Sequence, residues 1–95
     1  MTAAQLIAQV VNIVGKHFAI SPRIVLSCRS HQASAARAVI HAALSDIGYN
    51  GVQIAKATGF THQRVYKNLE RVETDKKLRN KYREIKPRIN ELKTI

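Results

Sequence analysis

The segment from Gly51 to Val72 constrains this chain most, because it predicts two short helices joined by a tight turn. Gly59 can adopt the left-handed backbone conformation that ends a helix, where other residues are strained. Thr61 follows as a predicted N-cap, since its hydroxyl can accept hydrogen bonds from free backbone N–H groups. The order of helix, glycine turn, cap and helix is typical of a helix-turn-helix.

The second helix of this segment is predicted to be amphipathic. Val65, Leu69 and Val72 recur at i, i+4 and i+7 and form one apolar stripe. At about 100° per residue, Gln63 and Lys67 point the opposite way. Three charged residues flank them: Arg64, Glu70 and Arg71. A helix with one buried face and Gln, Lys and Arg on the other can enter a DNA major groove. We therefore expect a helix-turn-helix over about residues 51–72.

The charge agrees with a nucleic-acid partner. The net charge is +10 on 95 residues, and the isoelectric point is near 10.4. Residues 1–15 carry no charge, whereas residues 58–95 carry eleven Lys/Arg against five Asp/Glu. A basic domain gains affinity for phosphate backbones by releasing condensed counterions. An RNA-binding or ribosome-associated helical protein would show the same charge and remains an alternative.

The chain length allows one domain over residues 1–95 with a single core. We expect an all-α fold, a five- or six-helix bundle that contains the helix-turn-helix. Its predicted helices cover about residues 2–17, a short stretch opened by Ser21-Pro22, residues 33–47, the two helices of 51–72, and about residues 74–94. A T-x-x-Q capping box at Thr2 and Gln5 begins the first of them. The Ala-rich helix over 33–47 is expected at the centre, ending at Gly48.

The predicted C-terminal helix carries an apolar seam with heptad spacing. Its members are Leu78, Tyr82, Ile85, Ile89 and Leu92. Pro87 lies within it and is expected to kink or break the helix near residues 84–86. The seam either packs on its own domain or forms a homodimer through residues 74–95. Two heptads are short for a coiled coil, so the sequence favours a monomer.

No catalytic or metal-binding motif is apparent, so we expect neither an enzyme nor a cofactor. The single Cys28 and the four His residues show no zinc-ligand spacing. His41 is expected to be a partly buried structural residue, and Tyr66 to lie at the rim of the core. No apolar run is long enough to span a bilayer. We predict a cytoplasmic, nucleoid-associated protein with no membrane contact.

The order of these features resembles the C-terminal DNA-binding domain of the bacterial replication initiator DnaA, of the Trp-repressor-like helix-turn-helix group. The similarity covers roughly residues 5–94. Leu26-Ser27-Cys28-Arg29-Ser30 is similar to the family's basic loop, and Arg37 follows at the family's spacing. Thr61-His62-Gln63-Arg64-Val65 stands where the family has its signature, with Gln63 and Arg64 in place of two small hydroxyl residues. Gln favours adenine and Arg favours guanine by bidentate geometry.

The resemblance implies roles for the matched positions. Arg29 would enter the minor groove, and Arg37 would hold a phosphate. Four residues would meet base edges and phosphates in the major groove: Thr61, His62, Gln63 and Arg64. Together with the outward-facing Lys67 and Arg71, they form the predicted DNA-binding set. Because the resemblance includes no ATPase domain, it implies a small regulator of replication or transcription that binds double-stranded DNA with sequence preference.

Two other functions are compatible with the sequence. RNA-binding proteins usually offer exposed aromatic side chains for stacking, and this chain has only three Tyr and two Phe. A protein-interaction module would use residues 74–95 as a partner helix. A comparison of binding to duplex DNA, single strands and structured RNA distinguishes these classes.

Overall fold

The computed structural model describes residues 2–93, and all regular structure within this range is helical, which confirms the predicted all-α class. The five helices are α1 (Ala3–His17), α2 (His31–Ile47), α3 (Gly51–Thr58), α4 (His62–Thr74) and α5 (Lys76–Lys93). No described helix combines the length and the apolarity that a membrane span needs.

The predicted capping box starts α1. The backbone N–H of Thr2 donates to Oε1 of Gln5 at 2.9 Å, and the N–H of Gln5 donates to Oγ1 of Thr2 at 3.2 Å. These two bonds satisfy N–H groups that have no partner inside the helix. The helix then runs to His17, as the sequence predicts.

The prediction of a short helix that starts at Ser21-Pro22 is wrong, because this segment forms successive turns instead. The N–H groups of Ile24 and Val25 both donate to the carbonyl of Ser21. Those of Ser27 and Cys28 both donate to the carbonyl of Ile24. A stretch this short gives too few hydrogen bonds to offset the cost of nucleating a helix. The bundle therefore has five helices within the described residues.

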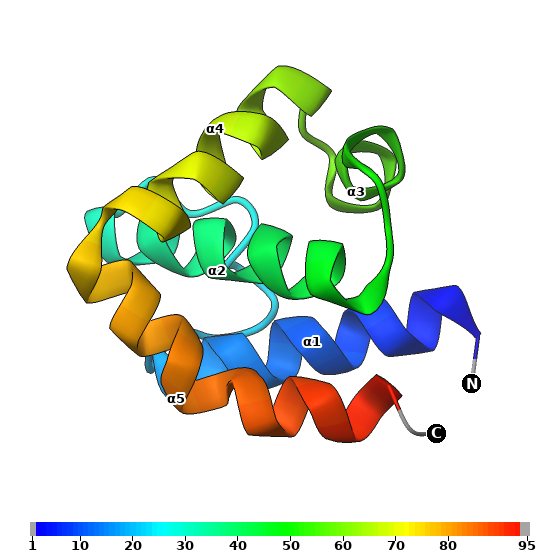
Figure 1. Cartoon of the computed structure of the whole chain (residues 1–95), viewed down its shortest axis with the longest axis horizontal. Helices are drawn as coiled ribbons and strands as arrows, with labels where there is room; N and C mark the ends of the chain where they lie inside the picture. Colours follow the sequence, from blue (N-terminus) through cyan, green and yellow to red (C-terminus); the bar gives the residue numbers. More distant parts are fainter. Residues whose placement is uncertain (1, 94–95) are drawn as a thin grey trace.

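The helix α2 lies at the centre of the molecule and contacts each of the other four helices. Figure 1 shows it passing between α4 on one side and α1 on the other. It begins at His31, two residues earlier than predicted, because Ser30 is its N-cap and accepts from the N–H of Ala33 at 3.1 Å. The predicted end at Gly48 is confirmed.

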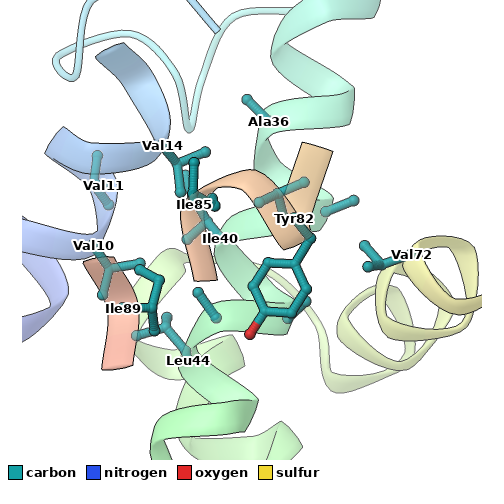
Figure 2. Close-up of a cluster of buried hydrophobic side chains, with 14 of the residues drawn as sticks. Val10, Val11, Val14, Ala36, Ile40, Leu44, Val72, Tyr82, Ile85 and Ile89 are labelled. Carbon is teal, nitrogen blue, oxygen red and sulfur yellow. The ribbon is translucent and has the colours of Figure 1, made fainter. Parts of the chain in front are cut away.

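The apolar seam of α5 is buried within the chain, with every member at most 9% exposed. Figure 2 shows Ile85 and Ile89 beside Val10 and Val14 of α1, in a cluster that α2 completes. Of the predicted kink or break near residues 84–86, the break is wrong, because α5 continues through Pro87. Its ribbon nevertheless changes direction part-way along in Figure 1. The helix starts at Lys76 rather than 74, and residue 94 lies outside the described residues.

Candidate nucleic-acid interface

Residues 59–61 join α3 to α4 and adopt the predicted turn. Gly59 has φ 77°, in the left-handed region, and its N–H donates to the carbonyl of Ala55 at 2.9 Å. Thr61 caps α4, since its Oγ1 accepts from the N–H of Arg64 at 3.2 Å. The turn therefore sets where α4 begins by local hydrogen bonds alone.

A buried polar network fixes α3 and α4 against α2. The hydroxyl of Thr58 on α3 donates to the carbonyl of Ile54 at 2.7 Å. Its oxygen therefore accepts from Nε2–H of His41 on α2, at 3.1 Å. The other ring nitrogen of His41, Nδ1, then accepts from Nδ2 of Asn68 on α4 at 2.9 Å. One neutral imidazole thus holds both helices, with both its nitrogens satisfied.

His41 is more buried than the sequence predicts, because it is fully inaccessible to solvent. Burial, and to a smaller extent the positive charge of Arg37, lowers the pKa of the imidazole from 6.5 to about 4. The neutral ring is the form that can accept from Asn68 while donating to Thr58. His41 is therefore a structural residue, as expected.

The outer face of α4 gathers the predicted base-contacting residues. Gln63, Arg64 and Lys67 are exposed. Together with Thr61 they line a shallow, open hollow of about 390 Å³. No acidic side chain is among these lining residues, so the hollow presents amide, guanidinium and ammonium groups to solvent. This set can donate hydrogen bonds to base edges or to phosphates.

Tyr66 lies on the same exposed side of α4, which corrects the expectation that it lies at the core rim. Its side chain is 53% exposed. The ring of His62 meets it edge to face, with centroids 6.3 Å apart. A Cβ atom on Gly51 would lie 2.7 Å from Cζ of Tyr66, so the ring packs closely on the start of α3. Tyr66 and His62 therefore extend the polar face with aromatic surface.

Arg37 was predicted to bind a phosphate at the surface, but much of its side chain is engaged in contacts within the fold. It is half-buried, and its Nη1 donates to the carbonyl oxygen of Val25 at 3.1 Å and also to that of Cys28. Its guanidinium lies 5.8 Å from the ring centroid of Phe60. Arg37 thus fastens the turns between α1 and α2 to the side of α2. Arg37 and Arg64 line the same polar hollow of about 210 Å³.

The last two predicted residues lie apart from the outer face of α4. Arg71 is half-buried, and its Nη1 donates to Oγ of Ser34 on α2 at 3.1 Å. Arg29 is exposed in the loop before α2 and lines neither of the two hollows. The structure therefore brings the predicted residues of the first turns of α4 together and places Arg37 beside Arg64, whereas Arg71 and Arg29 lie apart from them.

Three residues at this site were not predicted. They are Ser34, Phe60 and Asn68, all lining the smaller hollow. Asn68 left a signal in the sequence, because it lies three residues after Val65 and four before Val72, on the apolar stripe. A polar residue there predicts a buried hydrogen-bond partner. Ser34 and Phe60 carry no comparable signal.

Comparison with protein-family models, curated proteins and solved structures gives no match. The similarity to the DnaA C-terminal domain thus rests on sequence motifs and stays a prediction. Within residues 2–93, no three His, Cys, Asp or Glu side chains gather closely enough to hold a metal ion.

Proposed function

We propose that this chain binds double-stranded DNA with sequence preference, and that α3 and α4 act as a helix-turn-helix with α4 in the major groove. One observation carries the proposal. Gln63, Arg64 and Lys67 are exposed together around one acid-free hollow, while Val65 and Val72 of the same helix are buried. Such a helix can dock without disturbing the core that supports it.

The proposal assigns separate roles to the exposed residues of α4. Gln63 suits the N6 and N7 atoms of adenine, and Arg64 suits the O6 and N7 atoms of guanine. Lys67 lies one turn after Gln63 and suits a phosphate oxygen. Thr61 and His62 precede them at the end of α4 that would enter the groove.

Arginines outside α4 would position the duplex. A guanidinium has five N–H donors, and Arg37 uses Nη1 for two backbone carbonyls. Its other donors are available for a phosphate beside the hollow that Arg64 also lines. Arg71, whose guanidinium is held in place by its hydrogen bond to Ser34, would contact the same DNA strand. Arg29 would reach the minor groove, as the resemblance to DnaA implies.

The biological role that fits this proposal is a small regulator of replication or of transcription. The DnaA-like order of the basic loop, Arg37 and residues 61–65 supports it. Binding at sites related to those of an initiator would let such a protein compete for them.

A binding comparison tests the proposal. Duplex DNA, single-stranded DNA and structured RNA are titrated with the full chain in the presence of competitor. We expect the duplex to bind most tightly. With about 5 phosphate contacts, log K should fall with log salt at a slope of about −4 to −5. A nearly flat slope, or a preference for RNA, would contradict the proposal.

A further inference from the structure

Most of the positive charge in the C-terminal half lies on α5 and not on the proposed DNA-binding helix. The helix α4 carries three Lys/Arg and two Glu, a net charge of +1. The helix α5 carries eight Lys/Arg and two Glu, a net charge of +6. Docking of α4 alone therefore leaves the most basic element of the chain without a role.

Four of these residues form what we call the basic row: Lys76, Arg79, Arg83 and Lys86. They follow each other at spacings of three, four and three residues, so they share one side of the helix, and all four are exposed. At 1.5 Å per residue the row is about 15 Å long. Like charges at these spacings destabilise a helix, and a bound polyanion would remove that cost.

Acidic groups near the basic row compensate it only in part. Nζ of Lys86 lies 3.9 Å from a carboxylate oxygen of Asp46, and both side chains are well exposed. The guanidinium of Arg79 donates to the backbone carbonyl of Glu73 at 3.4 Å. Glu84 on α5 lies 2.8 Å from Nε2 of His17 on α1. Of the ion pairs found among the described residues, only the one between Lys86 and Asp46 involves the row, so Lys76, Arg79 and Arg83 pair with no carboxylate.

We propose that the basic row is a second nucleic-acid surface, which binds the sugar-phosphate backbone of a duplex segment other than the one at α4. A single chain would then bridge two duplex segments. The bridging rests on the proposed function of α4, whereas the contact of α5 with a phosphate backbone does not.

The surface of α5 favours a duplex over a membrane or a single strand. Its apolar seam is buried, and the large exposed apolar side chains in the described part of the chain are Ile24, Val52 and Tyr66, all on other segments. The helix thus has no apolar face to insert into a lipid interface. Its only aromatic side chain, Tyr82, is 9% exposed and offers no platform for stacking unpaired bases. What remains is contact with a regular array of phosphates, of which a duplex has one per about 1.7 Å.

The position of the basic row separates it from the proposed base-contacting residues. The helix α4 has 13 residues, so its first turn lies about 20 Å from its junction with α5. Figure 1 shows α5 turning back from that junction, with its second half on the far side of α2 from α4. The row therefore begins at the end of α4 that lies farthest from its base-contacting first turn, and continues along α5 from there.

A bridging assay with the full chain tests this proposal. One duplex is immobilised, and capture of a second, labelled duplex is measured. The row variant Lys76→Gln/Arg79→Gln/Arg83→Gln is compared with Lys16→Gln/Arg23→Gln/Arg88→Gln, which removes the same charge from exposed positions outside the row and outside the proposed helix-turn-helix. We expect the wild type and the control variant to capture the second duplex, and the row variant to lose capture at least tenfold. For the row variant, the slope of log K against log salt should become shallower by about 3.

Equal capture by the row and control variants would overturn the proposal. Capture of the second duplex by dimers of the row variant would also overturn it. Vesicles of phosphatidylserine and single-stranded RNA form further arms. Row-dependent binding to either that exceeds binding to duplex at the same salt would also overturn it. Because the replaced side chains are exposed, helical circular dichroism should be unchanged in both variants.

A third variant separates this proposal from the function proposed for α4. Gln63→Ala/Arg64→Ala/Lys67→Ala should lose bridging but still bind one duplex through α5. Bridging by this variant at the wild-type level would contradict the role of α4. Loss of backbone binding in the row variant would still support the role of α5.

Discussion

Nδ1 of His41 lies 2.9 Å from the amide nitrogen of Asn68, which ties the central helix α2 to the outward-facing helix α4. Through Nε2 the same ring binds Thr58 on α3. The helix that carries the candidate base-contacting residues is thus oriented by a buried polar network. Buried networks of this kind favour one arrangement over others, because each unpaired group would be costly.

The first prediction is that folding stability falls in mild acid because of His41. The imidazole has a pKa of about 4 in the folded chain against 6.5 when unfolded. Between these values the unfolded chain binds the proton and the folded chain does not. Stability should therefore decrease as pH falls from 6.5 to 4, by about 3 kcal/mol from this group, and level off below.

Urea unfolding across this pH range measures the effect. In His41→Gln, the part of the decrease that His41 contributes should disappear. The exposed His62 provides a matched control, and His62→Gln should retain the wild-type pH dependence. An unchanged profile in His41→Gln would show that this group is not buried in its neutral form.

The second prediction concerns the partner of that ring. Asn68→Ala leaves Nδ1 of His41 buried without a donor, and we expect a loss of about 1–3 kcal/mol in the free energy of unfolding. Asn80 is exposed on α5, so Asn80→Ala should change stability by less than about 0.5 kcal/mol. Similar losses in the two variants would argue against the buried network.

The third prediction concerns the turn. At Gly59 a side chain would meet no atom within 4 Å, but φ is 77°. The cost of a substitution there comes from the backbone alone. Gly59→Val should therefore destabilise the chain by about 1–2 kcal/mol, and Gly59→Asn by less, since Asn tolerates the left-handed region. Thermal unfolding of both variants decides this, and equal losses would count against a left-handed turn.

The turn and its cap were predictable because their causes are local. Gly59 and Thr61 act within three or four residues, and the capping box of Thr2 and Gln5 does the same. The segment after Ser21-Pro22 also has a local start signal, yet it forms only turns. Arg37 binds the carbonyls of Val25 and Cys28 from twelve and nine residues away, and this contact has no local pattern.

Contacts with residues far away in the sequence determine which side chains of α4 are buried where the local pattern does not predict it. The apolar stripe predicts Val65, Leu69 and Val72 as buried; Val65 and Val72 are buried, and Leu69 is half-buried. Tyr66 is exposed while the polar Asn68 is buried, because Asn68 has a partner in His41, 27 residues earlier. Composition alone gives the basic excess, but only the packing of α5 shows that its basic row is exposed.

The fourth prediction concerns the apolar seam. Leu78 is 5% exposed within a single chain, so Leu78→Asp should unfold it, while Lys77→Asp at the exposed neighbouring position should leave it folded. The wild type should sediment as a monomer. A wild-type dimer at micromolar concentration whose Leu78→Asp form is a folded monomer would show that the seam is an interface between copies.

The most direct test of the central claim is the affinity of α4 variants for preferred and random duplexes. After selection of preferred sites from a random duplex pool, Gln63→Ala and Arg64→Ala should each cost about 1–3 kcal/mol on the preferred site and much less on random duplex. Lys67→Ala should weaken both nearly equally, and Gln9→Ala on the exposed side of α1 should change neither. If Gln63→Ala and Arg64→Ala leave affinity and preference unchanged, α4 does not contact bases and the proposed function is wrong.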